Sequence, residues 1–190
     1  MIYEFIGLPG AGKSYLSRRL SEEKRLSRVE SSGRLERLIR SVLFTLRHPF
    51  FTLRLMKVFI RENRHDRTLL RHKLSTVLVE VFAREHKARR GTVVETGFFQ
   101  LFLSLFERPI EERDLSHFFG WLKKRPYRVC IVEASLEVRM RRMSERRRIP
   151  RAGLQNARER EAWFNLLEHN FAVLKKSIIR HCEHEVITNN

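Results

Sequence analysis

The motif that most restricts the possible folds of this chain lies close to its first residue. Residues 7–14 read Gly-Leu-Pro-Gly-Ala-Gly-Lys-Ser, which matches the pattern G-x-x-x-x-G-K-[ST] at every fixed position. An apolar stretch precedes the motif and a helical pattern follows it, so the glycines lie at a strand-to-helix turn. Glycine lets backbone N–H groups point towards a phosphate without a side-chain clash, and the helix N-terminus adds partial positive charge. The sequence therefore predicts a loop that binds the phosphates of a nucleoside triphosphate.

Each part of this loop has an expected role. Lys13 is expected to reach the β- and γ-phosphates of ATP, and the Ser14 hydroxyl is expected to bind Mg²⁺. The residues that we assign to nucleotide binding are Gly7, Pro9, Gly10, Ala11, Gly12, Lys13, Ser14 and Tyr15.

Apolar runs alternate with helical patterns along the rest of the chain. We expect strands at residues 2–6, 92–95, 128–133 and 185–188, and helices at 13–26, 33–47, 51–63, 68–88, 98–106, 110–123, 136–147 and 157–181. Such alternation predicts an α/β fold with three layers, in which a central parallel sheet carries helices on both faces. We expect one domain over residues 1–190, with the long helical stretch 30–90 inserted as a cap over the sheet edge.

Composition limits the possible partners and the compartment. The chain has 39 Lys and Arg against 22 Asp and Glu, which gives a formal net charge of +17. Such a surplus indicates anionic partners: nucleotides, phosphorylated metabolites, nucleic acid or an anionic membrane surface. The two cysteines, Cys130 and Cys182, form no disulfide framework and fit a reducing, cytoplasmic setting. No stretch has the roughly 18 uninterrupted apolar residues that a membrane span needs.

A second segment, together with the phosphate-binding loop, resembles a known family of proteins. The run CIVEASLEVRMRRMSERRR is similar to the strand, helix and lid of P-loop kinases, specifically the thymidylate-kinase-like branch of nucleoside and nucleotide kinases. The matching residues are Glu133, Glu137, Val138, Arg142 and Arg146. The resemblance implies an arginine-rich lid over residues 139–156. In this lid Arg142 and Arg146, one helical turn apart, would stabilise the negative charge that develops during phosphoryl transfer.

The same resemblance implies an acidic residue at the end of the second core strand. Glu95 occupies that place, where it would take the acceptor's proton or help to organise Mg²⁺. The family more often has an aspartate there. Asp66 is the other candidate catalytic carboxylate, and a carboxylate that caps the next helix is an alternative role for Glu95.

The stretch from residue 41 to 64 interleaves large apolar residues with arginine and lysine. It fits the inner face of a cap whose arginines hold an anionic acceptor. It also fits a basic amphipathic helix lying on an anionic membrane, or a surface for a protein partner.

These observations favour a cytoplasmic, ATP- and Mg²⁺-dependent phosphotransferase. Its expected acceptor is a small anionic molecule: a nucleotide, a nucleoside or a sugar-phosphate-like metabolite. The opening EFIGLPGAGKS also resembles kinase-like proteins of bacterial cell-surface polysaccharide pathways. The rival class is a nucleotide-binding NTPase or regulatory module that contacts nucleic acid or an anionic membrane. The lack of a stacking-aromatic pattern in the sequence disfavours nucleic acid.

Overall fold

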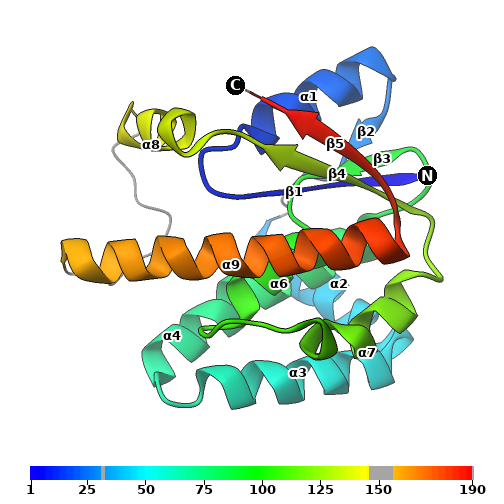
Figure 1. Ribbon diagram of the computed structural model, residues 1–190. Helices are drawn as coiled ribbons and strands as arrows, with labels where there is room; N and C mark the ends of the chain where they lie inside the picture. Colours follow the sequence, from blue (N-terminus) through cyan, green and yellow to red (C-terminus); the bar gives the residue numbers. More distant parts are fainter. Residues whose placement is uncertain (31–32, 146–155, 190) are drawn as a thin grey trace.

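The computed structural model describes residues 1–30, 33–145 and 156–189 (Figure 1). Its centre is a parallel sheet with the strand order β2-β3-β1-β4-β5, so the strand that leads into the phosphate-binding loop is the middle one. The neighbouring strands are parallel throughout, and Gly7 at the end of β1 lies level with Val132. The strands are β1 (Ile2–Gly7), β2 (Ser27–Arg28), β3 (Thr92–Val94), β4 (Tyr127–Glu133) and β5 (Glu183–Thr188).

Helices cover both faces of this sheet. The helices are α1 (Lys13–Glu23), α2 (Arg34–Arg47), α3 (Pro49–Asn63), α4 (Arg67–His72), a π-helix (Lys73–Leu78), α5 (Val79–Lys87), α6 (Phe98–Leu105), α7 (Glu112–Leu122), α8 (Leu136–Glu145) and α9 (Ala157–His181). In Figure 1, α1 lies on one side of the sheet, whereas α6 and α9 lie on the other with α3 and α7 beyond them. The expected three-layer α/β/α arrangement is confirmed.

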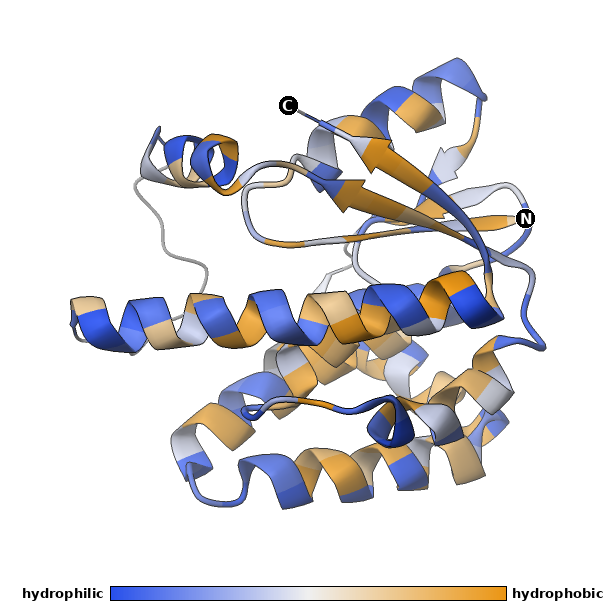
Figure 2. Ribbon diagram, in the orientation of Figure 1, coloured by the Kyte–Doolittle hydropathy of each residue, from blue (hydrophilic) through white to orange (hydrophobic). Residues whose placement is uncertain are grey.

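The two faces carry cores of very different size, because alternate strand residues point to opposite sides. Phe5, Cys130 and Val132 form the smaller core with Ala11 and Val93, against the α1 side chains. The opposite strand residues, such as Ile6 and Ile131, join a large cluster that includes α5, α6, α7 and α9. Figure 2 shows hydrophobic residues concentrated in the strands, with hydrophobic and hydrophilic residues alternating along the long helix α9. The larger core anchors the helices between β2 and β3, which form one wall of the site described below.

Two local features differ from the sequence prediction. Strand β2 was not predicted, because two residues are too short to show any periodicity; it exists only by pairing Ser27 and Arg28 with β3. The helix expected at 68–88 is divided by a π-helical turn, which shifts the inward face by one residue. The buried Lys73 begins this turn and donates to Asn63 Oδ1 at 2.9 Å.

Among the described residues, no helix is both long enough and apolar enough to cross a bilayer.

Candidate functional site: a phosphate-binding loop beside a basic cavity

The loop between β1 and α1 has the conformation that its glycines predict. Gly10 and Gly12 have φ angles of 81° and 93°, in the left-handed region that favours glycine. A Cβ on Gly10 would lie 2.6 Å from the carbonyl oxygen of Arg139, so the position has no room for a side chain. The Lys13 ammonium folds back over the loop and donates to Gly7 O at 2.7 Å and to Leu8 O at 3.2 Å. The loop is therefore preshaped around a cationic centre.

Two oxygen-bearing side chains meet at the end of this loop. The Ser14 hydroxyl donates to Glu95 Oε1, although the two residues come from different elements, the first turn of α1 and the end of β3. The other carboxylate oxygen of Glu95, Oε2, lies 3.4 Å from a guanidinium nitrogen of Arg28. Hydroxyl and carboxylate oxygens are the ligands that Mg²⁺ prefers. The two residues that the sequence assigned to the metal are thus brought together and fit it chemically.

The arginines of the expected lid have different environments. Arg142 Nη1 donates to the carbonyl oxygen of Asn189 at 3.0 Å, and the Asn189 amide donates to Ala11 O of the loop at 2.8 Å. Arg139 is buried and pairs instead with Glu168 on α9, so it supports the packing of α8. Arg146 and most of the lid segment 139–156 lie outside the described residues. Arg142 is therefore the described arginine of this helix that reaches the loop.

Two further residues singled out in the sequence lie apart from this centre. Asp66 caps α4, where its carboxylate accepts a hydrogen bond from the Leu69 amide at 2.8 Å. That local role explains the aspartate without any catalytic task. Tyr15 follows the loop, with its side chain 63% exposed.

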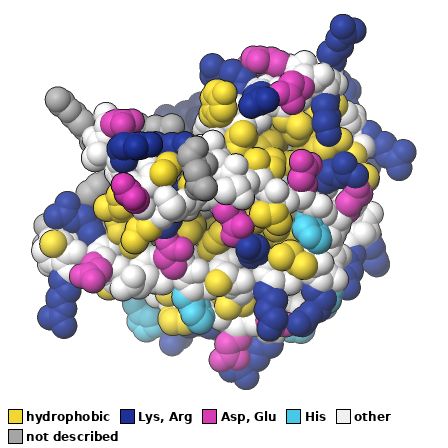
Figure 3. Space-filling view, turned by 45° about the horizontal axis from the view of Figure 1, so that its top comes forward, with side chains coloured by type: hydrophobic (Ala, Val, Ile, Leu, Met, Phe, Trp, Pro, Cys, Tyr) yellow, Lys and Arg dark blue, Asp and Glu magenta, His cyan; other side chains and the backbone are white. Residues whose placement is uncertain are grey.

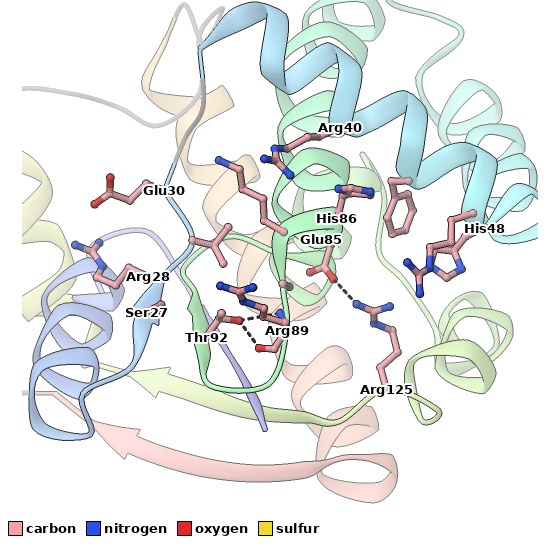
Figure 4. A pocket seen from close by; sticks show the side chains of 15 residues that line it. Ser27, Arg28, Glu30, Arg40, His48, Glu85, His86, Arg89, Thr92 and Arg125 are labelled. Atoms are coloured by element: carbon pink, nitrogen blue, oxygen red, sulfur yellow. Dashed lines mark hydrogen bonds and ion pairs between the residues drawn. The ribbon is translucent and has the colours of Figure 1, made fainter.

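A cavity of about 750 Å³ opens beside the edge of the sheet, bounded by β2, α2, α5 and the segment before β4. Its volume is in the range of small-molecule sites. Figure 4 shows Arg40 and His48 projecting into it from one wall, with His86 and Arg125 on others. Its charged and titratable lining residues are Arg28, Glu30, Arg40, Arg47, His48, Glu85, His86, Lys87, Arg89 and Arg125. Six Lys and Arg against two Glu make this lining strongly basic.

The imidazoles in the cavity respond to this charge. Burial lowers the pKa of His48, and the positive charges of Arg125 and Arg47 lower it further. The pKa of His86 is lowered in the same way, by burial and then by Arg40 and Arg47. Both rings are therefore kept neutral near pH 7, because another positive charge here is unfavourable. An anion in the cavity would relieve this repulsion.

Glu85, which lines the cavity, belongs to a pair of buried carboxyl groups. Glu4 on β1 accepts from the Phe99 amide at 2.6 Å, and Glu85 on α5 accepts from the Tyr127 hydroxyl. Burial raises the pKa of Glu85 to about 7 and raises that of Glu4 well above its usual value. One oxygen of each carboxyl group has no hydrogen-bond partner, and both oxygens lie within 3 Å of the place that a Cβ on Gly97 would take. A glycine at 97 therefore leaves room for the pair.

The sequence interpretation missed Arg28 and Glu30. The Val29 amide donates to Val93 O at 2.9 Å, so the chain after β2 continues alongside β3. Extending the pairing of these two strands places Glu30 opposite Glu95, at their carboxyl ends. An acidic residue at a parallel strand's carboxyl end is a signal for a ligand site. The signal was invisible because β2 itself was not predicted.

Comparisons with known proteins agree with this geometry. A family model described as "AAA domain" matches residues 2–165. A deoxyadenosine kinase from M. mycoides, solved with bound dATP, has a TM-score of 0.54 and 14% identity, over 99% of this chain and 91% of that one. A shikimate kinase from Acinetobacter baumannii, solved with shikimate, has a TM-score of 0.53 and 16% identity, over 100% of this chain and 83% of that one. A comparison with curated proteins found no match.

These likenesses concern the fold, and the narrower resemblance to the thymidylate-kinase-like branch stays a prediction. The glycine loop on the central strand, the family model and the fold of the two solved kinases point to one class of protein. The chain belongs to the AAA domain family, and its fold is that of a P-loop kinase.

Proposed function

We propose that this protein is an ATP- and Mg²⁺-dependent phosphotransferase whose acceptor is a small anionic molecule bound in the basic cavity. One observation carries the proposal. Arg28 lines the cavity and also lies 3.4 Å from Glu95, the carboxylate that accepts a hydrogen bond from Ser14 of the phosphate-binding loop. Contacts from Arg28 to Glu95 and from Glu95 to Ser14 therefore link the cavity to the loop, as neighbouring acceptor and donor sites require.

On the donor side, the loop amides and Lys13 would hold the phosphates of ATP. Ser14 and Glu95 would hold Mg²⁺, which would neutralise negative charge on the phosphate groups. Arg142 contacts the carbonyl side of the loop through Asn189. A modest movement of its guanidinium would bring a positive charge to the transferring group.

On the acceptor side, the lining favours a molecule with a phosphate or carboxylate group in addition to its reacting hydroxyl. Figure 4 shows Arg40 and Arg125 on walls of the cavity away from Arg28, and these two would bind that anionic group together with Arg47, which also lines the cavity. The reacting hydroxyl would then lie at the Arg28 end. A phosphorylated sugar or nucleoside satisfies both requirements. Membership of a cell-surface polysaccharide pathway remains a prediction from the sequence.

The two carboxylates at this edge suit different tasks. Both oxygens of Glu95 are engaged, one with Ser14 and one with Arg28, which suits a residue that positions metal. Glu30 is exposed, lines the cavity and follows the neighbouring strand, so it is the better candidate for accepting the hydroxyl proton. This assignment divides between two residues the alternative roles that the sequence offered for Glu95, for which Asp66 was the other catalytic candidate.

The test is to incubate the protein with labelled ATP, Mg²⁺ and separate pools of phosphorylated and neutral sugars and nucleosides. We expect a labelled product from an anionic pool, none with Lys13→Ala, and a higher Mg²⁺ requirement with Glu95→Gln. Glu30→Gln should lower the rate with little change in the Mg²⁺ requirement. ATP binding without a labelled product from any pool would contradict the phosphotransferase proposal and favour the regulatory module.

A further inference from the structure

Helix α2 buries one apolar residue, Phe44, and leaves its other large apolar residues exposed. A surface helix normally turns its apolar stripe to the core and its charges to water. In α2 the inward side carries Arg37, which pairs with Glu80 of α5 at 3.0 Å, and Arg40, which lines the cavity. The outward side carries large aliphatic residues, with exposed fractions of 44–72%: Leu35, Leu38, Ile39, Val42, Leu43 and Leu46. At 100° per residue, these six lie within an arc of roughly 140°.

The exposed apolar surface continues on α3. Phe50 is 81% exposed and Leu53 is 67% exposed, and Ile60 lies further along the same helix at 47%. Of the fifteen large hydrophobic residues recorded as exposed among the described residues, nine lie between Leu35 and Ile60. We call these nine residues the α2–α3 apolar patch. Such a concentration marks an interaction surface rather than ordinary scatter.

Positive charge accompanies this patch. Residues 37–61 contain arginine and lysine but no aspartate or glutamate. Arg54 and Lys57 lie between the exposed Leu53 and Ile60 of α3, and Arg61, which follows Ile60, pairs with Glu62 at 3.0 Å. Figure 2 shows hydrophobic and hydrophilic residues interleaved along that helix. Arg54 and Lys57 have no acidic partner within the part of the chain that the structure describes. On the face shown in Figure 3, Lys and Arg side chains are interspersed with Asp and Glu.

We propose that the α2–α3 apolar patch docks onto a bilayer that contains anionic phospholipids. Helices of this kind lie in the interface plane, with apolar side chains among the acyl chains and basic side chains at the headgroups. A second copy of the chain would bring two basic surfaces together, which is unfavourable. Nucleic acid would leave the aliphatic side chains in water. An anionic lipid surface satisfies the charge and the apolar area together.

This docking does not depend on the proposed enzymatic activity, because the arginines that line the cavity belong to the other side of α2. The two functions of the helix are therefore separable by mutation. Leu46 and Phe50 lie at the corner where α2 meets α3 and are 71% and 81% exposed, so replacing them creates no cavity in the core.

The experiment is co-sedimentation of the full chain with vesicles of phosphatidylcholine alone or of phosphatidylcholine with phosphatidylglycerol. We expect binding only to the anionic vesicles, weakening as salt is added. Leu46→Glu and Phe50→Glu should each weaken binding by about tenfold or more, and Arg54→Glu by a similar factor. Matched controls on α9 are Ile179→Glu, which replaces an apolar residue that is 45% exposed, and Arg158→Glu, which reverses an exposed charge.

Circular dichroism and thermal melting of every variant would show that the fold is retained. Equal binding to neutral vesicles, or equal losses in the α9 controls, would overturn the proposal. Sedimentation velocity without lipid would measure the oligomeric state of the wild type and of Phe50→Glu. A dimer that Phe50→Glu dissociates, without any binding of the wild type to vesicles, would assign the patch to a second copy instead.

Discussion

The phosphate-binding loop and the basic cavity are adjacent but are built in opposite ways. The loop uses eight consecutive residues, and its chemistry comes largely from backbone amides that glycine exposes. The cavity uses side chains from four separate stretches of chain around residues 28, 40–48, 85–92 and 125. The donor site is therefore specified locally, whereas the acceptor site exists only after the helices between β2 and β3 have packed. Substitutions should affect the two sites independently.

The largest effect is expected at Gly10. Gly10→Ala would place a Cβ 2.6 Å from the Arg139 carbonyl oxygen at a φ of 81°. We expect phosphoryl transfer to fall by about 100-fold or more, because the loop amides would be displaced. Stability should fall by about 1–2 kcal/mol. Gly120→Ala is the control, since nothing lies within 4 Å of a Cβ there. If Gly10→Ala retains full activity, the loop does not hold the phosphates as described.

A second effect concerns the buried carboxyl pair of Glu4 and Glu85. The pKa of Glu85 rises on folding from 4.5 to about 7, so the folded state favours its neutral form. The contribution of Glu85 to the free energy of unfolding is complete below pH 4.5 and is lost as pH rises through about 7. This loss amounts to roughly 3 kcal/mol. We expect the melting temperature to decrease between pH 5.5 and 8, and Glu85→Gln to flatten the decrease. An unchanged slope in the variant would assign the pH dependence to other groups.

A smaller effect is expected at the acceptor side. Arg47→Gln removes one positive charge from the cavity, and a hydrogen bond to a charged group contributes about 1.5–3 kcal/mol. We expect the KM for an anionic acceptor to rise by about tenfold, with the affinity for ATP unchanged. Arg54→Gln on the outer face of α3 is the matched control in lipid-free assays. A parallel loss of ATP affinity in Arg47→Gln would show that the two sites are not independent.

The smallest effect is expected at Asp66, which lies outside both sites. Asp66→Ala removes the cap of α4 and should lower the free energy of unfolding by about 1 kcal/mol. Activity should not change, and Asp66→Asn should retain most of the stability because asparagine also caps helices. Kinetic assays beside denaturant titrations measure both quantities. A large loss of activity in Asp66→Asn would restore the carboxylate to the list of catalytic candidates.

Much of the fold followed from local pattern. The apolar run before the glycines gave β1, the run before Glu133 gave β4, and the periodic pattern from 157 to 181 matches α9 at both ends. These segments were predictable because burial on a sheet face or a helix face imposes a period on the sequence. Strand β2 and the π-helical turn depend on pairing and packing with distant residues, so no local sequence pattern predicts them.

The sequence alone determined the phosphate-binding loop, because its residues are contiguous and the backbone conformation of such a loop requires its glycines. It also assigned Ser14 and Glu95 to the same metal ion, and the structure brings the two side chains into contact. Only the tertiary structure decided the roles of the basic residues. It turned Arg139 towards Glu168, Arg142 towards the loop, and Arg40 and Arg47 into a cavity. It also decided that the leucines of α2 face outward. The physical reason is that spacing along the chain fixes which residues share a helix face, but packing against α5 fixes which way that face points.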